Sequence, residues 1–312
     1  MGTKYFYDCA TKLALDLFGK VQDGLNSGTI NRPKVIWLEL SGCSGNIISL
    51  MNADQPGIGY FLTQMVDLVF ENSLNAKEGE QAMENLFGAL DEEFILIVEG
   101  AVALRDEGRF TIIGRYQGRN ITALEAARTF GERAKHVLAM GTCAADGGIS
   151  AAAPNSSACV GLQDVLQRPV IRVPGCPCNP AWLLTTLAHI LLFGPPELDA
   201  FNRPTMIYGT TIHDRCPRRS YFDSGIFASQ LGEETCLFLV GCRGPVTLTD
   251  CPIRRWNQRV NWPVGDDSPC IGCAQFGFPD AMEPFVLYPA NSEISMAQEG
   301  IRTTFMTGES MG

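Results

Sequence analysis

Twelve cysteines constrain this 312-residue chain more than any other feature. Residues 1–20 carry charges throughout and lack an apolar segment followed by a small-residue cleavage site, so they do not resemble a secretory signal. Because cytosolic thiols stay reduced, this context disfavours a disulfide-rich binding protein. We therefore expect a cytoplasmic protein whose thiols are available to bind metal.

Composition narrows the class of protein further. Hydrophobic residues make up 46% and charged residues 19% of the chain, as in a packed globular protein. The formal net charge of -10 predicts no nucleic-acid partner, because contacts to phosphates need a basic surface. The longest apolar run, 181–193, is too short to span a bilayer and indicates a buried helix.

Four short apolar segments lead directly into loops of small residues. They cover residues 35–40, 94–98, 136–140 and 170–173, and helical patterns at 59–70, 79–90 and 122–133 lie between them. Alternating strands and helices predict an α/β fold with a doubly wound parallel sheet. In such sheets, ligands bind outside the carboxyl ends of the strands.

The chain divides into four regions by its patterns. Residues 1–33 form an extension with one amphipathic helix, which either packs on its own domain or docks a partner chain. Residues 34–200 form the sheet domain. Residues 201–285 carry six cysteines and few periodic segments, so we expect a small loop-rich domain whose core is partly inorganic. Residues 286–312 form a polar C-terminal tail.

Three of the four strand ends carry a cysteine, and these form the first set: Cys43, Cys143 and Cys176. Thiolates hold iron–sulfur clusters, and a four-iron cluster normally takes four of them. The position where a Cys-x-x-Cys pair would end is Asn46. The fourth ligand is therefore Asn46, Cys178 or water, or the cluster has only three irons. The alternative is three unrelated buried cysteines.

The second set combines one imidazole with three thiols. His213 lies three residues before Cys216, and Cys236 and Cys242 follow. These four side chains make a complete ligand set, although the spacing alone would also suit structural zinc.

The third set has three thiols and no evident fourth ligand. It consists of Cys251 and the close pair Cys270 and Cys273. Structural zinc sites are closed by four ligands, so a three-iron cluster fits this set better than zinc. We interpret Cys9 and Cys159 as ordinary thiols. No dinucleotide-binding fingerprint, Walker A loop or nucleophile elbow is present, so the chain is predicted to carry electrons.

The motifs around these cysteines resemble those of the small subunit of a nickel–iron hydrogenase over roughly residues 34–285. They include Gly42-Cys43-Ser44-Gly45, Val98-Glu99-Gly100-Ala101, Gly141-Thr142-Cys143-Ala144, Pro174-Gly175-Cys176-Pro177, His213-x2-Cys216-Pro217, Cys251-Pro252 and Cys270-Ile271-Gly272-Cys273. The resemblance implies a flavodoxin-like sheet domain followed by a small loop-rich iron–sulfur domain. The first set would hold the proximal cluster, the second set the distal cluster and the third set the medial cluster.

The resemblance also implies cofactors and partners. The medial cluster would be 3Fe–4S, and the proximal and distal clusters would each be 3Fe–4S or 4Fe–4S. The NiFe(CN)2CO centre would belong to a separate large subunit, which splits hydrogen. Electrons would then pass singly through the proximal, medial and distal clusters to a quinone or an electron-carrier protein. We expect this chain to form an obligate heterodimer with the large subunit. The heterodimers are expected to pair into a dimer of heterodimers or a larger assembly. Any association with a membrane would be made through a partner.

Two departures from the usual motif suggest a subgroup. Asn46 replaces the second proximal cysteine, and Ile48 replaces a glutamate. This form resembles the cytosolic uptake (group 2) small subunits of cyanobacteria and aerobic hydrogen-scavenging bacteria, which implies hydrogen oxidation. We expect a relay of relatively high potential, poor at evolving hydrogen.

Two other interpretations compete with this one. The cluster-bearing subunit of a complex I-like oxidoreductase has a related fold, but it carries one cluster, whereas this chain offers three sets. A structural protein held together by zinc is the second alternative, and the ratio of iron to zinc would distinguish it.

Overall fold

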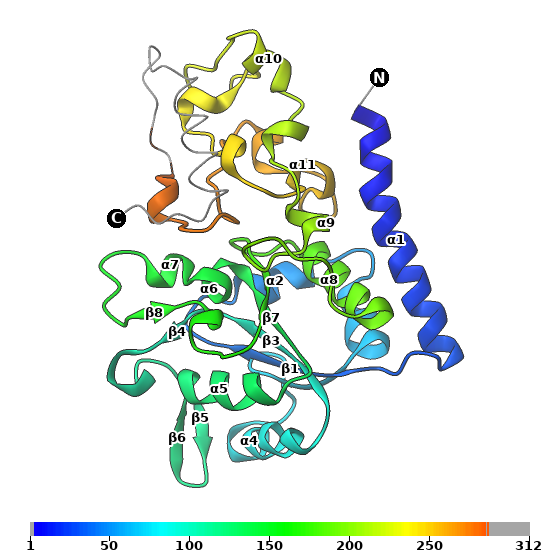
Figure 1. The fold of residues 1–312 in the computed structure, drawn as a ribbon, viewed down its shortest axis with the longest axis vertical. Coiled ribbons are helices and arrows are strands. Elements are labelled where there is room, and N and C mark those ends of the chain that lie inside the picture. The colour runs from blue at the N-terminus through cyan, green and yellow to red at the C-terminus, as the bar shows by residue number, and fades with distance from the viewer. Residues whose placement is uncertain (1–2, 285, 287–312) are drawn as a thin grey trace.

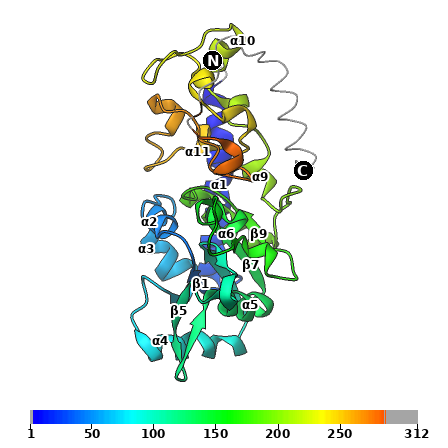
Figure 2. The same cartoon turned by 90° about the vertical axis from the view of Figure 1, so that its left-hand side faces the viewer.

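The computed structural model describes residues 3–284 and residue 286, with side chains from Leu13 onward. The predicted tail at 286–312 lies outside this part except for Val286, and so does the side chain of Cys9. Two parts are stacked on one another, and the N-terminal helix runs alongside both (Figure 1). Figure 2 shows the same stack from the side.

The sheet domain has a flavodoxin-like topology, as predicted. Five parallel strands lie in the order β2-β1-β3-β7-β9. They are β1 (Lys34–Glu39), β2 (Asp67–Glu71), β3 (Phe94–Glu99), β7 (His136–Met140) and β9 (Ile171–Val173). The order reverses between β1 and β3, which is where ligands bind in this class of sheet. Every residue of the central strand β3 is buried, because helices cover both faces.

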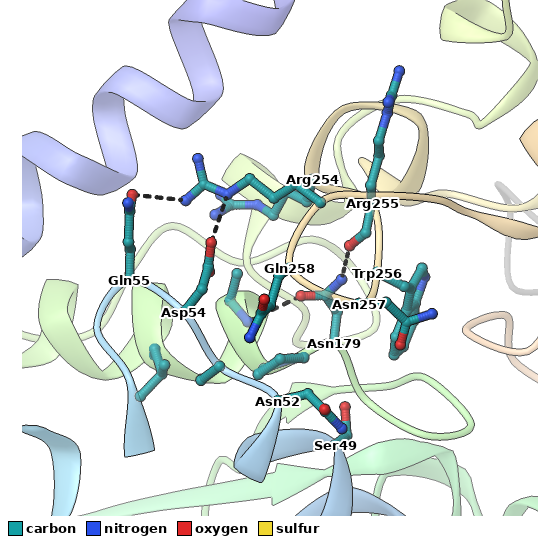
Figure 3. Close-up of a pocket in the computed structure, with 15 residues that line it drawn as sticks. Ser49, Asn52, Asp54, Gln55, Asn179, Arg254, Arg255, Trp256, Asn257 and Gln258 are labelled. Carbon is teal, nitrogen blue, oxygen red and sulfur yellow. Dashed lines mark hydrogen bonds and ion pairs between the residues drawn. The ribbon is translucent and has the colours of Figure 1, made fainter. Parts of the chain in front are cut away.

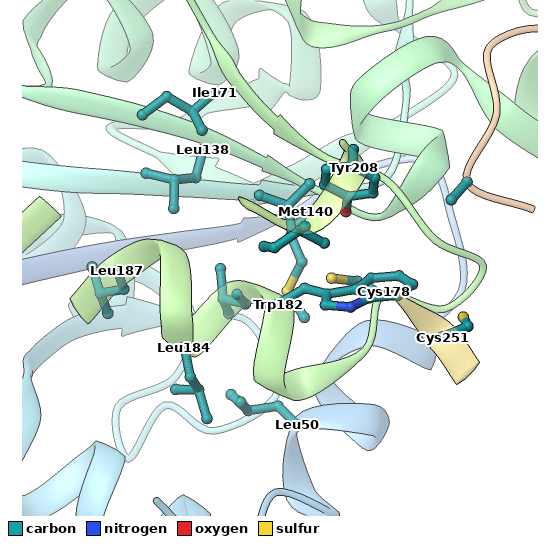
Figure 4. Close-up of a cluster of buried hydrophobic side chains, with 14 of the residues drawn as sticks. Leu50, Leu138, Met140, Ile171, Cys178, Trp182, Leu184, Leu187, Tyr208 and Cys251 are labelled. Carbon is teal, nitrogen blue, oxygen red and sulfur yellow. The ribbon is translucent and has the colours of Figure 1, made fainter. Parts of the chain in front are cut away.

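Two apolar clusters pack on opposite faces of the sheet, since successive strand residues point to opposite sides. The residues Ile95 and Ile97 of β3 face one cluster, which joins α1 (Thr3–Ser27), α2 (Gly45–Met51) and α8 (Pro180–Phe193). Figure 4 shows the part of this cluster around α8. Leu96 and Val98 face the other cluster, which joins α4 (Gly79–Gly88) and α5 (Ala123–Arg133).

Helices α8 and α5 each begin at a residue whose side chain caps the helix. The Asn179 side chain accepts a hydrogen bond from the Ala181 amide at 2.9 Å, and Pro180 takes the first helical position of α8. In the same way, Thr122 accepts from the Glu125 amide at 3.1 Å and starts α5. Both helices were predicted, and α8 is the buried helix expected at 181–193.

The predicted helix at 59–70 was wrong in its second half. The chain forms α3 (Ile58–Tyr60) and a π-helical turn (Phe61–Met65), and then extends into β2. β2 lies at the sheet edge beside β1, with Val35 paired to Leu68. An edge strand of five residues, only partly buried, carries too few alternating apolar positions to be distinguished from a helix.

The N-terminal helix α1 packs on its own chain, which was the simpler of the two expectations for it. It contacts α8, the π-helical turn and α11 (Cys251–Arg254). Its buried face includes Ala14, Leu17 and Val21. Within the described residues, no helix has the length and apolar character needed to cross a membrane.

Small elements complete the sheet domain. Two antiparallel pairs lie beside the main sheet, β4 (Val102–Ala103) with β8 (Cys159–Val160) and β5 (Ile112–Tyr116) with β6 (Arg119–Thr122). Two short helices, α6 (Gly141–Asp146) and α7 (Gly148–Ala151), follow β7 at its carboxyl end.

The C-terminal part is loop-rich, as predicted. Its described residues form α9 (Thr205–Tyr208), α10 (Arg219–Asp223), α11 and several 3-10 turns. It packs on the carboxyl edge of the sheet through the same apolar cluster that contains α8. The Trp182 indole donates to Asp250 at 2.6 Å, and the Tyr208 hydroxyl donates to the Pro174 carbonyl at 2.8 Å.

A small polar pocket marks the junction between the two parts (Figure 3). The Asn179 amide donates to the Arg255 carbonyl at 2.5 Å across this junction. Arg259 reaches Asp54 at 3.6 Å and Gln55 at 3.4 Å from the opposite side. These contacts fix the C-terminal part to the start of α8 and to the loop after α2.

Candidate functional site

The first cysteine set meets at the carboxyl edge of the sheet. Cys43 follows β1, Cys143 lies in α6 directly after β7, and Cys176 follows β9. The burial of Cys176 raises its thiol pKa to about 12, and Cys273, Cys143 and Cys43 add to the shift. The three residues of this set are therefore neighbours in space, although the first and the last are 133 positions apart in the sequence.

The backbone leaves room beside these sulfur atoms. A Cβ at Gly45 would lie 3.0 Å from the Cys43 sulfur, and a Cβ at Gly148 would lie 3.0 Å from the Cys143 sulfur. Gly148 also has a φ of +50°, which favours glycine. Such close approach of bare backbone fits a bulky group bound by both thiols.

Asn46 and Cys178, the two candidate fourth ligands, both contact other groups. The Asn46 side chain accepts from the Cys178 amide at 2.8 Å and donates to the Met140 carbonyl at 3.4 Å. The Cys178 side chain is fully buried in the apolar cluster with Met140 and Trp182 (Figure 4). Its thiol donates to the Asn179 carbonyl at 3.4 Å. Each candidate therefore already bonds to backbone groups of the protein.

The third set surrounds a cavity of about 480 Å³. Cys251 begins α11, and Cys270 and Cys273 lie on a turn where Gly272 has a φ of +75°. Burial raises the thiol pKa of all three, that of Cys251 to about 12. The Gly272 amide donates to the Cys270 sulfur at 3.4 Å. Cys176 of the first set also lines this cavity.

The second set lines a separate small cavity, to which all four predicted side chains contribute. Burial raises the thiol pKa of Cys236 to about 11, with Cys242 and Cys216 adding to the shift. The His213 ring meets the edge of Phe222, with centroids 4.4 Å apart. Aromatic packing therefore holds the imidazole beside the three thiols.

Two contacts connect the three sets in series. Cys176 and Cys273 line the same cavity, and the Cys273 thiol adds to the raised pKa of Cys176, so the first set adjoins the third. The Cys270 amide donates to the Cys242 sulfur at 3.4 Å, joining the third set to the second. The spatial order of the sets is therefore first, third, second, which differs from their order in the chain.

The donor chemistry fits iron–sulfur clusters. A buried thiolate is costly without a positive partner, and bound metal supplies that charge while releasing the thiol proton. Among the described residues, no three His, Cys, Asp or Glu side chains converge closely enough to hold one metal ion. Thiols that surround a cavity suit a polynuclear cluster better than a single zinc ion.

Three glutamates at neighbouring strand ends were not identified from the sequence. Glu39 and Glu99 are paired across β1 and β3, and Glu71 ends β2. Burial raises the pKa of Glu71 to about 8, and the nearby Glu39 adds to it. Burial also raises the pKa of Glu99 to about 8, with contributions from Glu39 and Glu71. Burial thus favours the neutral form of two carboxyl groups at this edge.

Known families match the two parts of the chain separately. Residues 208–286 match the family that describes the C-terminal region of NiFe/NiFeSe hydrogenase small subunits. Residues 43–190 match "NADH ubiquinone oxidoreductase, 20 Kd subunit". The match over the C-terminal part, with its second and third sets, favours the hydrogenase over the complex I-like alternative.

Whole-chain relatives agree with this assignment. The chain is 37% identical over 280 residues to the "Quinone-reactive Ni/Fe-hydrogenase small chain" of Wolinella succinogenes, covering 87% of this chain and 78% of that protein. It is 35% identical over 259 residues to the "Uptake hydrogenase small subunit" of Azotobacter vinelandii, covering 80% and 71%.

A solved structure supports the same family assignment. The fold superposes on an actinobacterial-type NiFe-hydrogenase chain from Ralstonia eutropha with a TM-score of 0.79 and 28% identity. The alignment covers 92% of this chain and 95% of that one. From its three cysteine sets, its flavodoxin-like sheet and these relatives, we conclude that the chain belongs to the small-subunit family of nickel–iron hydrogenases, which form part of heteromeric enzymes.

Proposed function

We propose that this chain is the electron relay of an uptake hydrogenase. Three iron–sulfur clusters would lie between the nickel–iron centre of the large subunit and an external acceptor. The observation that carries the proposal is the serial contact of the three sets. Cys176 and Cys273 line one cavity, and the Cys270 amide donates to the Cys242 sulfur, so each set adjoins the next.

These positions support a ligand assignment for each cluster. The proximal cluster would be held by Cys43, Cys143 and Cys176, and the medial and distal clusters by the third and second sets. Each bound cluster would supply a site that accepts one electron and passes it on. The protein buries four of these thiols and directs amide hydrogen bonds toward the sulfurs of Cys242 and Cys270; the buried thiols are Cys236, Cys242, Cys251 and Cys270.

The proximal cluster is proposed to have three irons, or four with a water ligand. Support comes from Asn46, whose oxygen and nitrogen atoms already bond to backbone groups. A cluster with fewer thiolates carries less negative charge and is easier to reduce, which raises its potential. Higher potentials favour hydrogen oxidation over hydrogen evolution.

We propose that the large subunit docks where Cys43 reaches the surface. Cys43 is exposed, and α2 begins two residues later. Ile48 is 57% exposed and Met51 49% exposed on this helix. Exposed apolar side chains beside the first electron-accepting site are consistent with a surface that a partner covers.

A quinone is the proposed acceptor, with an electron-carrier protein as the alternative. The Wolinella relative is named as quinone-reactive. The segment of this chain between the distal ligands Cys216 and Cys236 carries three exposed apolar side chains, namely Tyr221, Ile226 and Leu231. An apolar surface beside the last cluster suits an apolar acceptor.

We further propose that the enzyme is cytoplasmic and forms a dimer of heterodimers. Cell fractionation would test the localisation, and the mass of the native complex would test the oligomeric state.

A redox titration of the purified heteromer tests this proposal. We expect all cluster signals to titrate well above the ~-400 mV of plant-type ferredoxins. Under hydrogen, the complex should reduce a water-soluble quinone and show little hydrogen evolution from reduced ferredoxin. Cluster potentials near that of ferredoxin, or ready hydrogen evolution, would contradict an uptake relay.

A further inference from the structure

Thr142 lies at the junction of the proximal and medial ligand sets. It is the second residue of α6, directly after β7, and it is 1% exposed. Its sequence neighbour is Cys143, a proximal ligand. Its backbone amide donates to the Gly175 carbonyl at 3.0 Å, which joins the end of β7 to the loop before Cys176.

The side chain of Thr142 makes two further hydrogen bonds. The hydroxyl accepts from the Gly175 amide at 2.9 Å and donates to the carbonyl of Cys273. A threonine hydroxyl has a single proton, so the Cys273 carbonyl receives it. One buried hydroxyl thus contacts the residue before Cys176 and the backbone of a medial ligand.

These bonds surround the contact between the two sets. Cys176 and Cys273 both line the medial cavity. The Thr142 hydroxyl therefore ties the backbone of Cys273 to the residue before Cys176, while Arg203 holds the next residue of the same loop by donating to the Ala274 carbonyl at 3.3 Å.

We propose that Thr142 is a positioning residue that fixes the distance between the proximal and medial clusters, and with it the rate of the electron step between them. This inference rests on the proposed relay. In that step one electron leaves the reduced proximal cluster and enters the oxidised medial cluster. Because electron transfer falls steeply with separation, a small retreat of the Cys273 loop would slow it.

The two parts of the chain would remain packed without this hydroxyl. Trp182 bonds to Asp250 at 2.6 Å, and Tyr208 bonds to Pro174 at 2.8 Å. The Ala153 amide also donates to Asp280 at 2.9 Å. Loss of the Thr142 hydroxyl should therefore relax the Cys273 loop while the fold persists.

The test compares three variants of the complete heteromeric enzyme. Thr142→Val keeps the shape of the side chain and removes the hydroxyl, whereas Thr142→Ser keeps the hydroxyl and removes the methyl group. The matched control is Thr186→Val. Thr186 is also fully buried, but its hydroxyl bonds only to the Trp182 carbonyl within its own helix at 2.8 Å.

Three measurements separate positioning from general damage. Electron paramagnetic resonance would report the magnetic interaction between the proximal and medial clusters, which depends on their distance. Rapid freezing after addition of hydrogen would report how fast the medial cluster is reduced. Isotope exchange between deuterium gas and water needs no relay and would report the intact large subunit.

In Thr142→Val we expect a weaker magnetic interaction and a roughly tenfold slower reduction of the medial cluster, the lower end of effects seen for residues that orient metal ligands. Isotope exchange should be unchanged, and Thr142→Ser and Thr186→Val should match the wild type. If Thr142→Val does not bind its clusters, Thr142→Ser becomes the deciding variant. Wild-type cluster content and a wild-type magnetic interaction in Thr142→Ser would assign the role to the hydroxyl.

Two results would overturn the inference. One is a Thr142→Val enzyme with both clusters and wild-type interaction and rate. The other is a Thr142→Ser enzyme as impaired as Thr142→Val, which would assign the effect to the methyl group. A wild-type enzyme without interacting proximal and medial signals would instead reject the relay itself.

Discussion

The backbone amide of Cys270 donates a hydrogen bond to the sulfur of Cys242 at 3.4 Å. Cys270 belongs to the medial set and Cys242 to the distal set. The Gly244 amide reaches the same sulfur at 3.4 Å. Hydrogen bonds to cluster sulfurs are one of the means by which a protein sets reduction potentials. The geometry thus couples the environment of the distal ligand to the medial loop.

Replacing His213 with cysteine should preserve the distal cluster and lower its potential. A thiolate would replace the imidazole, and imidazole ligation is associated with higher potentials. His213→Ala should instead lose or convert the distal cluster, because it leaves only Cys216, Cys236 and Cys242. Redox titration and iron analysis would measure both effects. An unchanged distal signal in His213→Ala would remove His213 from the ligand set.

Replacing Cys178 with alanine should leave the iron content unchanged. The Cys178 side chain packs among Met140 and Trp182, so its loss creates a small cavity that costs about 1 kcal/mol. The matched variant Cys176→Ala should lose the proximal cluster. Iron analysis and thermal unfolding of the complex test the pair. Loss of the proximal signal in Cys178→Ala would make Cys178 the fourth ligand.

Replacing Asp250 with asparagine should destabilise the domain junction strongly. Asp250 is 2% exposed, and it accepts from Arg254 at 2.6 Å as well as from Trp182. The change leaves a buried guanidinium without its counter-charge, at a cost of about 3–5 kcal/mol. Because α11 begins with Cys251, the medial signal should also weaken.

The control is the exposed pair of Arg219 and Asp223, which has the same four-residue spacing and a distance of 2.8 Å. Asp223→Asn should change stability by less than about 0.5 kcal/mol. Urea denaturation of the complex would compare the two. Equal effects would mean that the buried pair contributes no more than the exposed one.

Replacing Glu71 with glutamine should make stability less dependent on pH. Burial raises the pKa of Glu71 from 4.5 in the unfolded chain to about 8 in the folded chain. The folded state therefore binds more protons, so its stability is full below about pH 4.5 and is lost progressively as the pH rises to about 8. Glutamine stays neutral and can accept the Ser73 amide bond that Glu71 makes at 2.8 Å.

Thermal unfolding at pH 5 and pH 8 would measure this effect. The Glu71→Gln enzyme should melt at a higher temperature than the wild type at pH 8 and at a similar temperature at pH 5. The exposed Glu84, changed to glutamine, serves as the control. A lower melting temperature for Glu71→Gln at pH 8 would show that the carboxylate is charged and stabilising there.

The sheet could be predicted from sequence because buried parallel strands form apolar runs bounded by small residues. The ends of β1, β7 and β9 then brought Cys43, Cys143 and Cys176 to one edge. The edge strand β2 was missed, since its polar ends and partial exposure give a weak pattern. Missing β2 also hid the glutamate group, because Glu71 could not be aligned with Glu39 and Glu99.

Contacts between the two parts could not be predicted. The approach of Cys176 to Cys273, and of Thr142 to the same loop, depends on how the C-terminal part packs on the sheet. No local pattern encodes that packing. Cys178 remained ambiguous for a similar reason, because Cys-Pro-Cys spacing does not say which thiol turns inward.

The most direct test of the relay is electron paramagnetic resonance of the purified complex, as isolated and after hydrogen, with iron and zinc quantified. The relay predicts three distinct iron–sulfur centres, all reduced by hydrogen, and negligible zinc. Stoichiometric zinc with no cluster signals, or centres that hydrogen does not reduce, would contradict it.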